Sequence, residues 1–188
     1  MDDDADDDAD PRTFSWSFNT RTIPETVHDD PVFHYRVNLE MTTGDQKHYA
    51  ISDGGADGCM GGRNCHETGS TGRYATVVGV HNEAIHRIPI CSFYMKVLAH
   101  NGIPVLLHVH NSPLNTSSNV SIISEYQVRD FGLIIDSISE RHPKGPNEFG
   151  TQRFQLNDVI HAKFVDIGAL MALEVLPYEE GEIGRAHV

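Results

Sequence analysis

The sequence predicts an all-β domain with one short helix. Hydrophobic residues make up 39% of the chain, and 16 Gly and 9 Pro are present, a composition typical of a compact, turn-rich β protein. Several short runs alternate apolar and polar residues, the pattern of half-buried strands. A helix-start signal is recognisable in a single segment. With 188 residues, the chain is long enough for one domain with its own core.

The predicted strands are rich in β-branched and aromatic residues and are separated by turns. Tyr35, Val37 and Leu39 alternate with polar residues, and residues 48–51 form a second strand. The dipeptide Asn101-Gly102 predicts a tight hairpin. Further strands are expected at residues 74–80, 88–98, 105–109 and 133–135, with residues 81–87 joining the first two, a loop at 143–150, and a strand or short helix at 169–176.

The predicted helix spans about residues 124–131. Ser124 and Gln127 have the spacing of a capping box, in which each side chain satisfies a free backbone N–H at the helix start. Gly132 stands where a helix commonly ends in the left-handed conformation.

Charge and composition divide the chain into four parts. Residues 1–31 are expected to be an acidic, disordered tail, because residues 1–10 contain seven Asp and no base. Residues 32–142 form the predicted domain, and residues 143–182 a loop with a C-terminal strand or helix. Residues 183–188 resemble a translated sequencing adapter, so the sequence predicts that the natural protein continues differently after residue 182.

The net charge of −13 argues against direct nucleic-acid binding, which requires a basic surface. No apolar run reaches the length of a membrane span, and no signal peptide is recognisable. The odd number of cysteines, Cys59, Cys65 and Cys91, favours reduced thiols. We therefore expect an intracellular, cytoplasmic protein without a membrane partner.

The candidate active site is the segment Asp53-Gly54-Gly55-Ala56, which follows a predicted strand. A carboxylate at a strand end can be directed at a water molecule, and the glycines allow a tight turn whose N–H groups can bind the carboxylate. This segment resembles the catalytic loop of retroviral-like aspartic peptidases, which reads apolar-x-Asp-Ser/Thr-Gly-Ala. The resemblance assigns the catalytic site to residues 53–56.

The order of the remaining elements also resembles that family, over residues 33–176. Ser121-Ile122-Ile123-Ser124 through Gly132 is similar to a segment of copia-type retrotransposon polyproteins, and Asp-Gly-Gly-Ala-Asp-x-Cys to the copia-like elements of diatoms and other marine algae. The resemblance implies a retropepsin-like half-barrel that cleaves its own polyprotein, needs no cofactor and works inside a virus-like particle. It also implies a flap over the peptide, formed by Gly79, Val80, His81, Asn82 and Glu83.

Because the motif occurs once, the resemblance implies a homodimer. Asp45, Asp136 and Asp166 lack the following Gly-Ala. One carboxylate must accept a proton from water while another donates one to the scissile carbonyl. A two-fold axis would place Asp53 beside Asp53 of the partner, sharing a proton as in the aspartic-protease dyad.

Gly54 departs from the family pattern and leaves a second function open. The usual Ser or Thr hydroxyl makes a hydrogen bond across the dimer, and its loss costs about 0.5–1.5 kcal/mol. The alternative is therefore an inactive or domesticated module with the same fold, used for dimerisation or peptide binding.

A third alternative is a metal-binding β domain. The chain offers soft-metal ligand types, and His108 and His110 would lie on one face of a strand. However, the spacing of these residues matches no recognised zinc pattern, and no Cys-x2-Cys pair occurs. We therefore expect no metal site among them. The ligand types considered are Cys59, Cys65, His66, His81, His86, His108 and His110.

Overall fold

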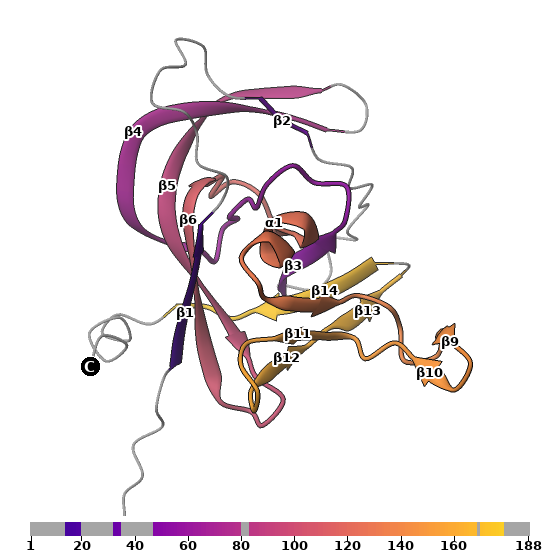
Figure 1. Ribbon diagram of the computed structural model, residues 1–188. Coiled ribbons are helices and arrows are strands. Elements are labelled where there is room, and N and C mark those ends of the chain that lie inside the picture. The colour runs from indigo at the N-terminus through magenta and orange to yellow at the C-terminus, as the bar shows by residue number, and fades with distance from the viewer. Residues whose placement is uncertain (1–13, 20–31, 35–46, 80–82, 169, 179–188) are drawn as a thin grey trace, which may run out of the picture.

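The computed structural model describes residues 14–19, 32–34, 47–79, 83–168 and 170–178. These residues are mostly β-strand with one short helix, which confirms the predicted class at that level. They form sheets of five, four, three and two strands that do not close into a barrel within the described ranges (Figure 1).

The largest sheet has the order β1-β6-β5-β4-β2. Its centre is a long antiparallel hairpin of β4 and β5 (Figure 1). Both strands are longer than predicted: residues 84–87 belong to β5 rather than to the connection. The predicted Asn101-Gly102 hairpin turn joins β5 to β6, with Gly102 at φ +79°. The strands are β1 (Phe14–Asn19), β2 (Val32–His34), β4 (His66–Val78), β5 (Ala84–Leu98) and β6 (Pro104–Pro113).

The second sheet carries the candidate site and has the order β13-β14-β3-β7. β3 (His48–Asp53) lies between β7 (Val120–Ser124), which runs parallel to it, and the antiparallel β14 (Leu170–Val175). β13 (Val165–Ile167) completes the edge. The apolar C-terminal stretch is therefore a strand, and it lies directly beside β3.

A three-stranded sheet and a small hairpin follow the helix. The sheet has the order β12-β11-β8, formed by β12 (His161–Lys163), β11 (Arg153–Gln155) and β8 (Ile134–Asp136). Residues 143–150, predicted as a loop, contain two short strands instead. They are β9 (Pro143–Gly145) and β10 (Glu148–Phe149), which pair antiparallel.

The helix α1 (Glu125–Asp130) begins and ends where the sequence predicts. The Ser124 side chain accepts a hydrogen bond from the Gln127 N–H at 3.3 Å, and Gly132 is left-handed at φ +73°. The reciprocal half of the capping box is wrong, however. The Gln127 side chain accepts from the Cys59 N–H at 3.0 Å, and the Ser124 N–H donates to Cys59 Sγ.

The core consists of two apolar clusters, one on each side of β3. Ala50 belongs to the larger cluster, together with Val128 of α1 and the buried Phe93, Phe154 and Phe164. Ile51 belongs to the smaller cluster, which includes Val77 of β4 and Ile88 of β5. Both faces of β3 are therefore buried, as its short apolar sequence requires. Among the described residues, no helix has the length and hydropathy of a membrane span.

Candidate active site at the end of β3

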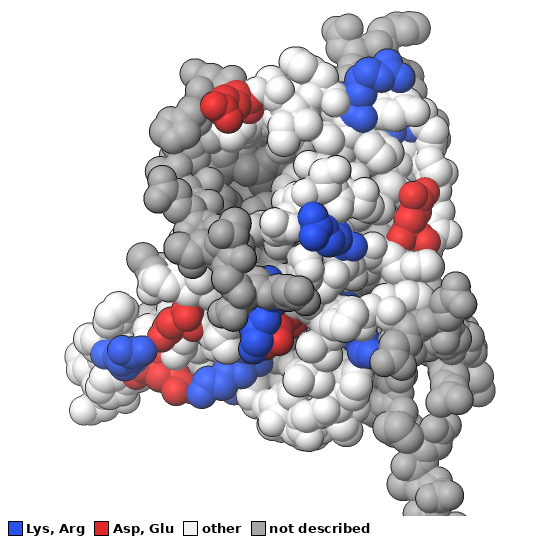
Figure 2. Space-filling model, turned by 180° about the vertical axis from the view of Figure 1, so that it is seen from behind, with Lys and Arg blue, Asp and Glu red and all other residues white. Residues whose placement is uncertain are grey.

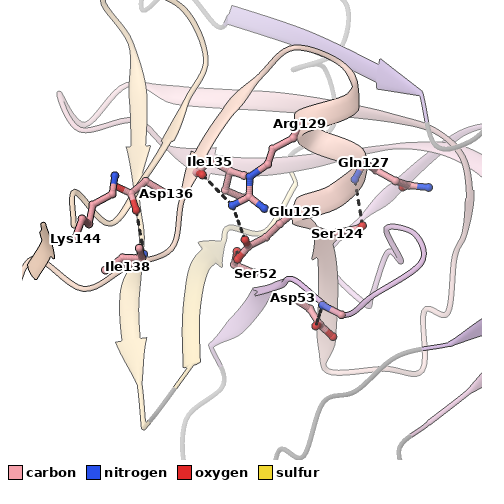
Figure 3. A network of polar contacts seen from close by, with 11 residues as sticks. Ser52, Asp53, Ser124, Glu125, Gln127, Arg129, Ile135, Asp136, Ile138 and Lys144 are labelled. Atoms are coloured by element: carbon pink, nitrogen blue, oxygen red, sulfur yellow. Dashed lines mark hydrogen bonds and ion pairs between the residues drawn. The ribbon is translucent and has the colours of Figure 1, made fainter. Parts of the chain in front are cut away.

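Asp53 is the last residue of β3 and begins the tight turn that the sequence predicts. It is half-buried, and its Oδ1 accepts a hydrogen bond from the Gly55 N–H at 2.7 Å. This contact two residues along closes an Asx-type turn. Figure 3 shows the Asp53 carboxylate directed toward this turn, whereas the neighbouring Ser52 points to the other side of the strand.

Strand alternation places Asp53 on the side of β3 that faces the β4–β5 hairpin. Successive side chains of a strand point to opposite faces, so Asp53 shares a face with Ile51. Ile51 lies in the same apolar cluster as Ala75, Val77 and Ile88 of the hairpin. Ala56, the last residue of the proposed motif, is 3% exposed and belongs to this cluster as well. The structure thus brings the motif and the base of the proposed flap together.

The structure describes the residues on either side of the hairpin tip, Gly79 and Glu83. The Gly79 N–H donates to the Glu83 carbonyl at 3.0 Å, which closes the turn. Figure 1 shows the hairpin arching over the segment that follows β3. Val80, His81 and Asn82, predicted as flap residues, lie outside the described residues. Ile85 pairs with Val77 and is 49% exposed, so an apolar side chain lies uncovered on the same side of the hairpin as Val77.

The start of α1 fixes the loop that follows Asp53. Ser124 Oγ donates to the Ala56 carbonyl at 2.7 Å, and Gln127 receives the Cys59 N–H. Met60 and Ile122 exchange two backbone hydrogen bonds, at 3.0 and 2.8 Å. Ser124, predicted to cap the helix, therefore both caps α1 and binds the loop.

A buried carboxylate behind the loop was missed by the sequence interpretation. Glu125 is 7% exposed; its Oε1 accepts from Ser52 Oγ at 2.7 Å, and its Oε2 accepts from Arg129 Nη2 at 2.7 Å (Figure 3). Arg129 also donates to the Ile135 carbonyl at 3.2 Å. The i,i+4 spacing of Glu125 and Arg129 on a predicted helix was the available signal. No pattern in the sequence indicated the contact between Glu125 and Ser52.

Gly54 does not occupy a conformation that requires glycine. Its φ lies outside the left-handed region, which among the described glycines holds Gly72, Gly102, Gly132 and Gly168. A Cβ at Gly54 would lie 3.7 Å from Glu125 Oε2, an ordinary contact. A side chain at residue 54 therefore has room and an unstrained backbone.

The three cysteines are free and buried, as their small apolar character predicts. Burial raises the pKa of Cys59 to about 12 and that of Cys65 to about 11, so neither thiol is a nucleophile at neutral pH. His108 and His110 do share a face of β6, with ring centroids 3.8 Å apart. In the described part of the chain, no three His, Cys, Asp or Glu side chains gather to hold a metal.

Comparison with protein-family models, with curated proteins and with solved structures found no match for this chain.

Proposed function

We propose that this chain is one half of a two-fold aspartic endopeptidase that cleaves the polyprotein of a copia-type retrotransposon. The observation that carries the proposal is the half-buried Asp53 carboxylate at the end of a parallel strand. It accepts the Gly55 N–H at 2.7 Å and stands on the face of β3 that the β4–β5 hairpin covers. In this proposal the sheets around β3 form a retropepsin-like half-barrel, and the second half of the site comes from a symmetric partner.

The proposed chemistry uses the two copies of Asp53 as one acid–base pair. Two adjacent carboxylates cannot both ionise readily, so they share a proton. The ionised carboxylate accepts a proton from water, the water oxygen attacks the peptide carbonyl, and the protonated carboxylate donates to the carbonyl oxygen. The tetrahedral intermediate then collapses: its C–N bond breaks, the leaving nitrogen takes the proton that the first carboxylate accepted from water, and the other carboxylate recovers its proton. No covalent bond to the enzyme forms. The peptide lies extended beneath the hairpin, where Ile85 offers apolar surface to its side chains.

The decisive experiment compares two aspartates of the same loop. The purified chain is incubated with a proteome-derived peptide library over pH 4 to 7, and new termini are identified by mass spectrometry. Asp53→Asn should abolish cleavage, because it removes the shared proton and preserves the shape. Asp57→Asn, at an exposed position four residues further along the same loop, is the matched control and should cleave as the parent does.

Assembly is tested in the same samples. Sedimentation at rising concentration should show monomer–dimer exchange, and the cleavage rate should follow the dimer fraction. Cleavage by Asp53→Asn at the parent rate, or by a strict monomer, would contradict the proposal.

A second candidate is favoured by Gly54, which cannot donate the hydrogen bond made by the usual Ser or Thr. In that case the same fold acts as a dimerisation or peptide-binding module. It would dimerise and retain extended peptides without releasing new termini, and Asp53→Asn would leave peptide binding unchanged.

A further inference from the structure

We propose that the cavity between α1, β8 and the β9–β10 hairpin binds a small organic carboxylate with an apolar body. The cavity has a volume of about 400 Å³, within the range of small-molecule sites. Its lining includes the basic side chains of Arg129, Lys144 and Arg153 and the exposed apolar side chains of Ile134, Ile138 and Phe149. The inference goes beyond the proposed peptidase and does not depend on Asp53.

Arg153 is a cavity-lining base that forms no ion pair among the described residues. It lies on β11, opposite Asp136 of β8 in the strand register. Its Nε is buried and has no hydrogen-bond partner, and no carboxylate of the described residues forms an ion pair with it. Buried donors in native proteins are nearly always paired, and an unpaired cationic one is particularly unfavourable. A ligand carboxylate in the cavity would supply this guanidinium with the counter-charge that it lacks.

The other two bases are already neutralised. Arg129 is paired with Glu125 at 2.7 Å, and Lys144 lies 3.1 Å from Asp136 and 3.8 Å from Glu148. Figure 2 shows acidic and basic side chains interspersed on the side where the β9–β10 hairpin projects. One uncompensated cation suits a singly charged ligand, and the planar fork of arginine matches a carboxylate.

The apolar side chains define the rest of the ligand. Ile134, Ile138 and Phe149 are 60%, 41% and 55% exposed, and all three line the cavity. A single exposed apolar side chain is common on protein surfaces. Several that line the same concave site are typical of a ligand-binding site. A ligand with a short aryl or aliphatic body would cover them while its carboxylate reaches Arg153.

The test uses the full chain and four commercially available probes. 4-Phenylbutyrate carries both head and body, 4-phenylbutan-1-ol lacks the charge, acetate lacks the body, and phenyl phosphate carries a more highly charged head. Binding is measured by saturation-transfer NMR and calorimetry. We expect 4-phenylbutyrate to bind at least about tenfold more tightly than each of the others, a difference of about 1.4 kcal/mol. Equal binding of the alcohol, or tighter binding of the phosphate, would overturn the proposal.

Two variants then locate the site. Arg153→Gln should weaken 4-phenylbutyrate at least about tenfold and leave the alcohol unchanged. Arg141→Gln is the control, because this guanidinium pairs with Asp166 and does not line the cavity. Phe149→Ala, on the exposed hairpin, should weaken 4-phenylbutyrate without affecting acetate, and it remains informative if Arg153→Gln fails to fold. Parent-like affinity of a folded Arg153→Gln, or of Phe149→Ala, would refute the site.

Discussion

Ser52 Oγ donates a 2.7 Å hydrogen bond to Oε1 of Glu125, which joins the strand bearing Asp53 to the helix behind it. Arg129 holds the other oxygen of the same carboxylate. The Asp53 turn therefore rests on a buried, fully engaged acid rather than on apolar packing alone. Such networks rigidify a site when every member is satisfied.

The first prediction concerns this buried carboxylate. Glu125→Gln should lower the free energy of unfolding by about 1–3 kcal/mol, because a neutral amide replaces the acceptor that binds Arg129. Glu140→Gln is the matched control. Glu140 pairs with Lys163 at 3.0 Å in a side-chain environment that is half exposed, so its loss should change stability by less than about 0.5 kcal/mol. Urea unfolding of both variants measures the difference. Equal losses of stability would mean that the Ser52–Glu125–Arg129 network stabilises the fold no more than an exposed ion pair does.

The second prediction concerns Gly54. Because its backbone is not left-handed and a Cβ has room, Gly54→Thr should preserve the fold and stabilise the chain by about 0.4–1 kcal/mol through a less flexible unfolded state. Gly72→Thr should destabilise instead. Gly72 has nothing within 4 Å of its Cβ position, but its φ is +71°, which strains a β-branched residue.

Thermal unfolding of the two glycine variants checks this contrast. If the proposed peptidase is correct, Gly54→Thr should also tighten the dimer or raise the cleavage rate by restoring the missing hydroxyl. Unfolding of Gly54→Thr would show that residue 54 departs from the geometry that the motif implies.

The third prediction concerns the β4–β5 hairpin, which we propose covers Asp53. The amides of Ala84, Ile85 and His86 lie near its tip, and their side chains are exposed. Ile122 and Ile123 are 2% and 1% exposed and belong to the core. Hydrogen exchange should therefore be faster at residues 84–86 than at residues 122 and 123. Equal protection would contradict a movable flap.

The fourth prediction concerns Asp136 and acid stability. Burial raises the pKa of this carboxyl, but hydrogen bonds from the Thr151 side chain, Lys144, and the Ile138 and Thr151 N–H groups outweigh it and lower the pKa below 3.8. A depressed folded pKa stabilises the folded state above the unfolded value, and this contribution is lost as pH falls through the folded pKa. Stability should therefore decline below about pH 4.

Asp136→Asn isolates that contribution. It should lower stability at pH 7 by about 1–3 kcal/mol, because four donors lose a charged acceptor. The difference between parent and variant should shrink as pH falls below about 4, because the unfolded parent then binds a proton at Asp136 that the folded parent, with its lowered pKa, still excludes. Urea unfolding at pH 7 and pH 3 measures both differences, and a constant difference would refute the role of Asp136 ionisation.

Features that depend only on neighbouring residues could be predicted from the amino-acid sequence. The Asn101-Gly102 turn, the cap at Ser124 and the helix end at Gly132 are local, and each is present. The alternation predicted from Tyr35, Val37 and Leu39 lies outside the described residues. The turn at Asp53 is local too, because its hydrogen bond spans two residues. Strand ends were less predictable. Exposed residues of β4 and β5 have no alternation to mark them, and pairing with the opposite strand extends the hairpin.

Tertiary structure alone decided which distant residues meet around β3. Ser52 and Glu125 are 73 residues apart, and Cys59 and Gln127 are 68 residues apart. The pairing of β14 with β3 joins the C-terminal stretch to the candidate site. No local pattern encodes these contacts, because they satisfy buried polar groups and strand edges that become neighbours only when the sheets pack. Gln127 illustrates the difference. Its spacing from Ser124 predicts a capping box, but its side-chain oxygen instead accepts a hydrogen bond from the buried Cys59 N–H.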